Sequence, residues 1–216
     1  MDVGELLDLI VRSAGAGKVP ILHAIGGEAL RQASRVSLAA LDRESGLAGL
    51  GVRIEHAEEL LAEWPGRWLP GFHGFSMQPN FVRAWQQPGG MYESRLGAAR
   101  SLSLNPFETV LEAGFDLGFG SDGMPFGPLY GIPGSTGHPA PGQTLTVGRA
   151  LSAYTLGSAG LSGFDDLARP VAPGRPAHLV VLPENPFESG FEGLEVMATI
   201  CDGRVVHGDR SVMEAE

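Results

Sequence analysis

The sequence predicts an α/β protein with a parallel sheet and a β-rich carboxyl-terminal segment. Short apolar runs alternate with longer amphipathic stretches, clusters of glycine and proline separate them, and the last fifty or so residues change to short β-like runs. Alternation of strands with helices is typical of parallel sheets, because parallel neighbours need a long crossover connection. We therefore divide the chain into a main α/β region, residues 1–165, and a β-rich segment, residues 166–216.

In the first third of the chain, helix and strand patterns alternate regularly. Leu6, Leu7, Ile10 and Val11 have helical spacing, whereas VPILHAI and VRIEHA are short apolar runs bounded by glycine. We expect these elements, in order: helix 4–14, strand 19–25, helix 27–47, strand 52–57, helix 57–64 and strand 72–78.

The remaining elements follow the same logic. Two helical stretches precede the apolar run FDLGFGS, and a segment rich in glycine and proline separates that run from the next helical pattern. A long irregular segment of this kind often carries function. We expect helices 93–102 and 106–113, strand 115–121, a loop over 122–143, helix 144–160, and β-like runs at 177–183, 195–203 and 204–208.

Composition limits the partners. The chain has 216 residues, 43% of them hydrophobic, and a formal net charge of −10 with no basic cluster, which argues against nucleic acid and anionic membrane and favours a small-molecule substrate. Cys201 is the only cysteine, so no intrachain disulfide can form. The first residues are acidic and no apolar run is long enough to span a bilayer. We expect a soluble cytoplasmic protein.

Three polar residues lie where strands are expected to end: His23, His56 and Asp122. Active sites of parallel α/β proteins form at this edge, and two histidines with one carboxylate can hold a catalytic metal with a position left for water. Each residue has a simpler explanation. A histidine can be a hydrogen-bonded structural residue, and Asp122 before Gly123 can be a turn residue. The sequence alone leaves both explanations open.

Four phrases in order resemble the second half of the amidohydrolase superfamily, and most closely its branch called amidohydrolase family 3. They are LHAIGGEAL (22–30), RIEHAEEL (53–60), FSMQPNF (75–81) and GFGSDGMP (118–125). The resemblance covers roughly residues 1–207. It implies strands five to eight of a TIM-like (β/α)8 barrel, followed by the carboxyl-terminal strands of a small β-sandwich.

By this resemblance, His23 and His56 would be metal ligands from strands five and six, and Asp122 would follow strand eight as a third ligand and as the general base. The cofactor would be a divalent metal, expected to be zinc. The reaction would be hydrolysis of a carbon–nitrogen bond, in a non-peptide amide, carbamate or related group, by a metal-activated water. Gln78 and His138 are the candidates for substrate contact.

One part of the family's pattern is missing from this sequence. The first barrel strand of such enzymes supplies a histidine-x-histidine pair, which occurs nowhere here. We therefore expect a truncated site, poorly active alone, in which Asp122 is less free to move a proton if it must complete the metal shell. The alternative is a noncatalytic half barrel that associates with itself or with a separate amino-terminal half.

Overall fold

The computed structural model describes residues 2–60, 72–164, 169–208 and 211. Its main sheet has four parallel strands in the order β1-β2-β3-β4, formed by Ile21–Ala24, Val52–His56, Phe72–Met77 and Asp116–Phe119. A second sheet contains three antiparallel strands, β5 (Leu179–Val181), β6 (Ala198–Cys201) and β7 (Arg204–Gly208). These observations confirm the predicted α/β class.

Helices lie between β1 and β2 and between β3 and β4. The segment up to β2 contains α1 (Val3–Gly15), α2 (Gly27–Leu41) and α3 (Leu47–Leu50). Between β3 and β4 lie α4 (Pro79–Phe81), the π-helical turn η1 (Val82–Gln86), α5 (Met91–Leu96), α6 (Ala98–Leu102) and α7 (Phe107–Glu112). After β4 come α8 (Pro128–Thr136), the 3-10 turn η2 (Pro141–Gln143), α9 (Val147–Ser152), the π-helical turn η3 (Ala153–Gly157), α10 (Ser158–Leu161) and, beyond β5, α11 (Pro186–Ser189).

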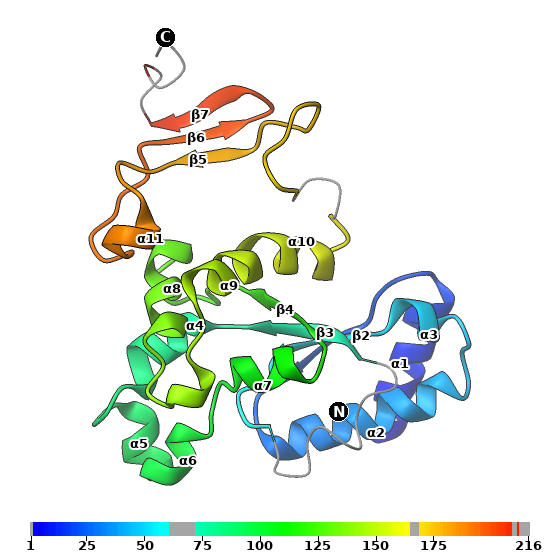
Figure 1. Ribbon diagram of the computed structural model, residues 1–216. Helices are drawn as coiled ribbons and strands as arrows, with labels where there is room; N and C mark the ends of the chain where they lie inside the picture. Colours follow the sequence, from blue (N-terminus) through cyan, green and yellow to red (C-terminus); the bar gives the residue numbers. More distant parts are fainter. Residues whose placement is uncertain (1, 61–71, 165–168, 209–210, 212–216) are drawn as a thin grey trace.

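Figure 1 shows how these elements form layers. Helices α9 and α10 lie between the main sheet and the small sheet, whereas α1 and α2 flank β1 and β2. The core lies where helices meet the sheet, and Phe75 at the middle of β3 is fully buried, with ring contacts to Phe72 and Phe115. Burial of such large apolar side chains is the main source of the fold's stability.

The interpretation of residues 122–143 as a loop was wrong for residues 128–136, which form α8. Pro128 occupies the first helical turn, where its missing N–H costs nothing, and Ile132 is fully buried. A high content of glycine and proline predicted coil, but packing of α8 against α4 outweighs this local preference.

The helix expected at 57–64 is absent over residues 57–60, and residues 61–64 lie outside the described part of the chain. Ala57 has a φ of 50°, which is outside the right-handed helical region, and its N–H donates to the Ala24 carbonyl at 3.0 Å. This hydrogen bond continues the contact between β1 and the end of β2 past His56. The division placed between residues 165 and 166 also falls in an undescribed segment.

Candidate functional site

The candidate site lies at the carboxyl edge of the parallel sheet. His23 is the third residue of β1, His56 is the last residue of β2, and Asp122 follows β4 by three residues. The register pairs Ala24 with His56, so the two histidines belong to adjacent strand ends. The carboxyl ends of parallel strands meet at one edge, and the fold therefore gathers these side chains from distant parts of the chain.

His56 is the centre of this group. Its Nε2 lies 3.1 Å from His23 Nδ1 and 3.8 Å from Asp122 Oδ2. The two imidazole rings meet edge to face, with centroids 4.3 Å apart. His56 is buried, whereas the Asp122 side chain is 58% exposed. A solvent-accessible carboxylate therefore stands beside a pair of facing ring nitrogens.

Backbone contacts hold the segments after β1 and β2 together. The N–H of Glu59 donates to the Ile25 carbonyl at 3.1 Å, and Glu59 Oε2 accepts from the N–H of Gly27, the first residue of α2, at 3.1 Å. The carboxylate of Glu59 also forms an ion pair with Arg100. A carboxylate at a helix amino terminus is favourable, because unpaired N–H groups point toward it. These contacts fix the spacing of the two strand ends that carry the histidines.

Backbone strain is concentrated at the same place. His56 has a φ of 74° and Asp122 a φ of 42°, a region that non-glycine residues rarely adopt. Such conformations persist where the surrounding structure enforces them, and they occur often at functional sites. These two conformations lie at the last residue of β2 and three residues past the end of β4.

The electrostatic environment keeps His56 neutral. Burial lowers the pKa of the His56 imidazole, and the neighbouring His23 lowers that pKa further, while Asp122 has the opposite effect. A neutral imidazole carries one nitrogen lone pair that can accept a proton or bind a metal. His56 thus has the protonation state that a metal ligand needs.

The two ring nitrogens suit a divalent cation. Zinc–nitrogen bonds of about 2.0–2.1 Å at a tetrahedral angle place two ligand nitrogens about 3.3 Å apart, close to the 3.1 Å between His56 Nε2 and His23 Nδ1. Among the residues that the structure describes, no three His, Cys, Asp or Glu side chains are grouped closely enough to hold a metal by themselves. The histidine pair fits a metal, and Asp122 would have to move closer to join it.

A buried carboxylate and an aromatic cluster border the site, and the sequence interpretation did not assign them. Glu58 is 5% exposed, and its Oε2 accepts a 2.5 Å hydrogen bond from the Tyr92 hydroxyl. Burial raises the pKa of Glu58, and both His23 and Asp122 also influence this pKa, so the carboxyl group faces the site. Its place two residues after His56 was the only signal in the sequence.

The aromatic cluster consists of Phe81, Trp85 and Tyr92. Phe81 stacks on His56 with ring centroids 6.0 Å apart and planes 12° from parallel. Trp85 packs against both Phe81 and Tyr92. Trp85 therefore has a packing role within the cluster. The cluster gives one side of the site an apolar wall.

The two residues expected to contact substrate occupy different surroundings. Gln78 directly follows β3, is 3% exposed, and donates from Nε2 to the Ser76 carbonyl at 3.3 Å. His138 is also buried, accepts from the Ala140 N–H at 3.0 Å, and packs against the Phe107 ring. Gln78 is thus near the histidine pair, whereas the described contacts of His138 connect it to other parts of the fold.

Comparisons with known proteins identify the family of this chain. Residues 2–207 match the model of a family described as "Amidohydrolase family", and the chain belongs to that family. The chain is 28% identical over 219 residues to the "Putative amidohydrolase YtcJ" of Bacillus subtilis (strain 168), a match that covers 94% of this chain and 40% of the relative.

Solved structures are also similar. An uncharacterised metal-dependent hydrolase from Pyrococcus horikoshii OT3 has a TM-score of 0.75 and 24% identity, covering 90% of this chain and 40% of that one. One from Pyrococcus furiosus has a TM-score of 0.70 and 26% identity, covering 87% and 38%. Ochratoxinase from A. niger shares the fold at 18% identity, with a TM-score of 0.64 and coverage of 96% and 46%. This chain thus spans about two-fifths of the first relatives' length.

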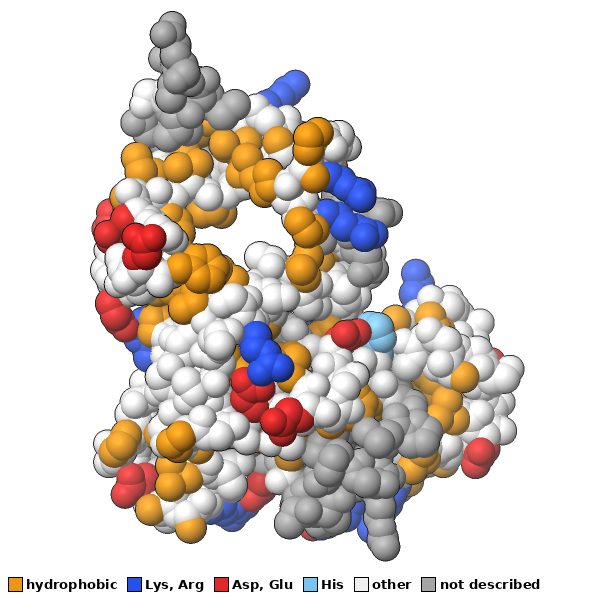
Figure 2. Space-filling view, in the orientation of Figure 1, with side chains coloured by type: hydrophobic (Ala, Val, Ile, Leu, Met, Phe, Trp, Pro, Cys, Tyr) orange, Lys and Arg blue, Asp and Glu red, His pale blue; other side chains and the backbone are white. Residues whose placement is uncertain are grey.

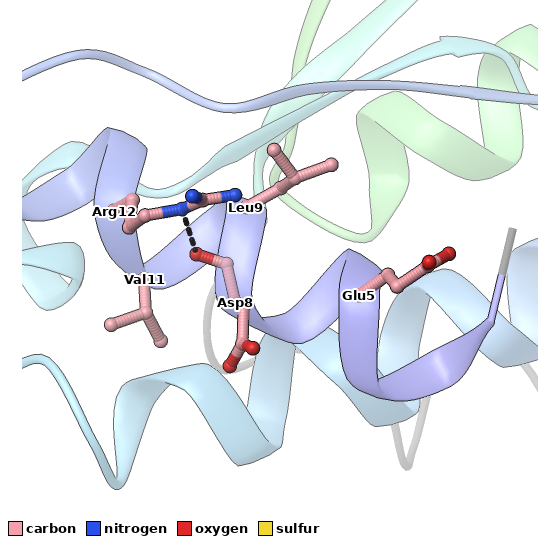
Figure 3. Close-up of a pocket in the computed structure, with 5 residues that line it drawn as sticks. All are labelled: Glu5, Asp8, Leu9, Val11 and Arg12. Atoms are coloured by element: carbon pink, nitrogen blue, oxygen red, sulfur yellow. Dashed lines mark hydrogen bonds between the residues drawn. The ribbon is translucent and has the colours of Figure 1, made fainter.

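No helix in the described part of the chain is long and apolar enough to cross a membrane. The outer face of α1 carries a hollow of about 460 Å³, which is drawn in Figure 3. This hollow lies away from the strand ends that carry the candidate site. It is lined by Glu5, Asp8, Leu9, Val11 and Arg12, which all come from α1. None of the facing histidine nitrogens borders it.

Proposed function

We propose that this chain provides the histidine and aspartate side of an amidohydrolase centre that hydrolyses carbon–nitrogen bonds of small molecules. In this proposal β1 to β4 correspond to strands five to eight of a (β/α)8 barrel, and β5 to β7 to strands of an accessory sandwich. One observation carries the proposal: His56 Nε2 lies 3.1 Å from His23 Nδ1 and 3.8 Å from Asp122 Oδ2, at the edge of the sheet where α/β active sites form.

His23 and His56 would hold the metal, for which we propose zinc because imidazole nitrogen suits this ion. When bound, a zinc ion supplies the Lewis acidity that lowers the pKa of water from about 15.7 to about 7. Asp122 would take the proton of the attacking water and deliver it to the departing amine. Its carboxylate is exposed and near His56, so it can contact both solvent and a bound substrate.

The surroundings of the pair support a small amide or carbamate substrate. Phe81 and Trp85 offer an apolar surface beside the histidines, and the Glu58 carboxyl group is a hydrogen-bonding group on the same side. Substrate pockets commonly combine an apolar wall with a few polar groups. We also propose the cytoplasm as the site of action, because the single cysteine is compatible with a reducing compartment.

Metal content and hydrolysis together test this function. We expect the purified chain to take up about one equivalent of zinc, and His56→Ala to abolish uptake. His207→Ala is the matched control, because His207 is an exposed histidine on β7. Hydrolysis of a panel of N-acyl amines and carbamates should require zinc and be lost in Asp122→Asn. Absence of zinc binding in the unmodified chain would refute the proposal.

A second candidate function is association with a complementary half barrel, and the open edge at β1 favours it. Five large apolar side chains on α1 and around β1 are at least 38% exposed: Val3, Leu9, Val19, Ile21 and Ile25. A groove of about 320 Å³ follows the same edge. Exposed edge strands with apolar side chains tend to pair with another chain.

The proposed occupant is a separate half barrel with its own parallel edge strand, and a second copy of this chain is the other outcome. Mass measurement by light scattering distinguishes a monomer, a homodimer and a complex with a co-expressed amino-terminal half. Ile21→Glu should weaken association, because Ile21 is 56% exposed at the edge. Met91→Glu changes an exposed residue on α5 and serves as control. A stable monomer that binds neither partner would contradict this candidate.

Figure 2 shows hydrophobic side chains on the small sheet and around the opening between this sheet and the main body. Val180 on β5 is 58% exposed, Val206 on β7 is 63% exposed and Phe187 on α11 is 64% exposed. The small sheet has three strands among the described residues. A small sheet with an exposed apolar face gains stability when another element packs against that face. This second apolar surface supports the same proposal of a larger assembly.

A further inference from the structure

Two buried polar atoms at the candidate site lack hydrogen-bond partners of standard geometry among the described residues: His56 Nδ1 and Gln78 Oε1. His56 ends β2 and Gln78 directly follows β3, the neighbouring parallel strand. An unsatisfied buried polar atom costs about 1–3 kcal/mol. One of these atoms can donate and the other can accept, so a hydrogen bond between them would satisfy both.

The orientation of Gln78 leaves only its oxygen for this role. Its Nε2 donates to the Ser76 carbonyl at 3.3 Å, which directs Oε1 away from that contact. Gln78 is 3% exposed, so solvent has almost no access to the amide. The parallel register places Glu55 opposite Ser76, so His56 and Gln78 follow this pair by one and two residues at the same edge of the sheet.

The orientation of His56 is equally restricted. Its Nε2 faces His23 Nδ1 and Asp122 Oδ2, so Nδ1 is on the other side of the ring. Phe81 stacks nearly parallel to the ring and restricts its rotation. A neutral imidazole has one N–H group. The hydrogen bonds of the ring determine which of its two nitrogens carries this proton.

We propose that Gln78 is a positioning residue that accepts the Nδ1–H of His56 and so keeps the lone pair of this histidine on Nε2. This inference rests on the proposed function, because the Nε2 lone pair is the one that would bind the metal beside His23. It assigns Gln78 to the imidazole rather than to the substrate. Groups that orient metal-binding histidines typically change metal affinity 10–100-fold when they are removed.

The test compares variants by a direct readout of the tautomer. Nitrogen-15 shifts of the metal-free protein, measured at one alkaline pH, distinguish Nδ1–H from Nε2–H in each histidine. In Gln78→Leu we expect His56 to lose its preference for the Nδ1–H form and zinc affinity to fall about 10–100-fold. Gln78→Glu retains an acceptor and should preserve the Nδ1–H form.

Gln143→Leu is the matched control. Gln143 is a half-buried glutamine whose side-chain amide, among the residues that the structure describes, bonds to Thr109, away from the strand ends that carry the histidines. It should leave both the His56 tautomer and zinc affinity unchanged. An unchanged His56 tautomer in a folded Gln78→Leu variant would overturn the inference. If the KM of that variant rises while the tautomer and the zinc affinity stay the same, Gln78 contacts the substrate instead. If the unmodified chain binds no zinc, the proposed function fails, while the tautomer measurement still decides the role of Gln78.

Discussion

A hydrogen-bonded chain secures the segment that follows Asp122, and its removal gives a measurable prediction. The Tyr154 hydroxyl donates to Asn80 Oδ1 at 2.8 Å, and Asn80 Nδ2 donates to the Pro125 carbonyl at 2.8 Å. Asn80 is fully buried. At Gly131 a Cβ would lie 1.8 Å from the Tyr154 hydroxyl oxygen, so glycine leaves the space that this contact needs. We expect Tyr154→Phe to destabilise the fold and loosen the segment carrying Asp122.

The size of the effect follows from what the substitution leaves behind. Burial raises the pKa of Tyr154, so its hydroxyl remains a donor near neutral pH. The ring packs against Phe119 at 5.4 Å between centroids, a contact that phenylalanine retains. The loss is therefore one hydrogen bond, which leaves Asn80 Oδ1 buried without its donor. This costs about 1–3 kcal/mol, and each kcal/mol lowers the Tm by about 2–4 °C in a chain of this size.

Urea unfolding of Tyr154→Phe and Tyr130→Phe measures this cost. Tyr130 lies under the Arg83 guanidinium, 4.4 Å from its ring centroid, and phenylalanine keeps that contact. No hydrogen bond of the Tyr130 hydroxyl is found among the described residues, so its removal should change the free energy of unfolding by about 0.5 kcal/mol or less. An equal loss in the two variants would refute the reasoning. Added substitution of Asn80 by alanine should reduce the effect of Tyr154→Phe, because the two share one hydrogen bond.

Three further outcomes are expected. Gly157→Ala should destabilise the protein by about 1–3 kcal/mol in urea unfolding, because its Cβ would lie 2.0 Å from the Leu117 carbonyl oxygen and force η3 away from β4. Phe75→Ala should cost about 3–5 kcal/mol in the same assay, because the side chain is fully buried. Burial lowers the pKa of His138 in the folded protein. Below the ordinary histidine pKa of about 6.5, the unfolded chain therefore binds more protons than the folded chain. The free energy of unfolding then falls as the pH falls, by up to about 1.4 kcal/mol per pH unit. His138→Gln should reduce this slope in unfolding measured from neutral to mildly acidic pH, whereas the exposed His207→Gln should not.

The order of the strands could be predicted from the sequence because each strand is short, apolar and bounded by glycine or a polar residue. The periodicity in VRIEHA places Val52, Ile54 and His56 on one face, and all three are buried in the structure. His56 could be proposed as a site residue because it falls at the end of this predicted strand and within the phrase RIEHAEEL. Local pattern is sufficient where burial and strand geometry agree.

The side of the site formed by Glu58 and Tyr92 could not be predicted in the same way. These residues are 34 positions apart in the chain, and a 2.5 Å hydrogen bond from the Tyr92 hydroxyl, on α5, to Glu58 Oε2 joins them. Composition also favoured an exposed loop at His138, but contacts with Phe107 and Ala140 bury it. Such pairings depend on tertiary packing, which local sequence does not record.

The two proposed functions involve one continuous surface. The groove along β1 is lined by Ile21 and Leu22 and also by His23, whose Nδ1 faces His56. A half barrel that docks at this edge would therefore contact a proposed metal ligand as it covers the exposed apolar residues. Association and metal binding are thus expected to strengthen each other, since a ligand that favours the assembled form is itself bound more tightly by it.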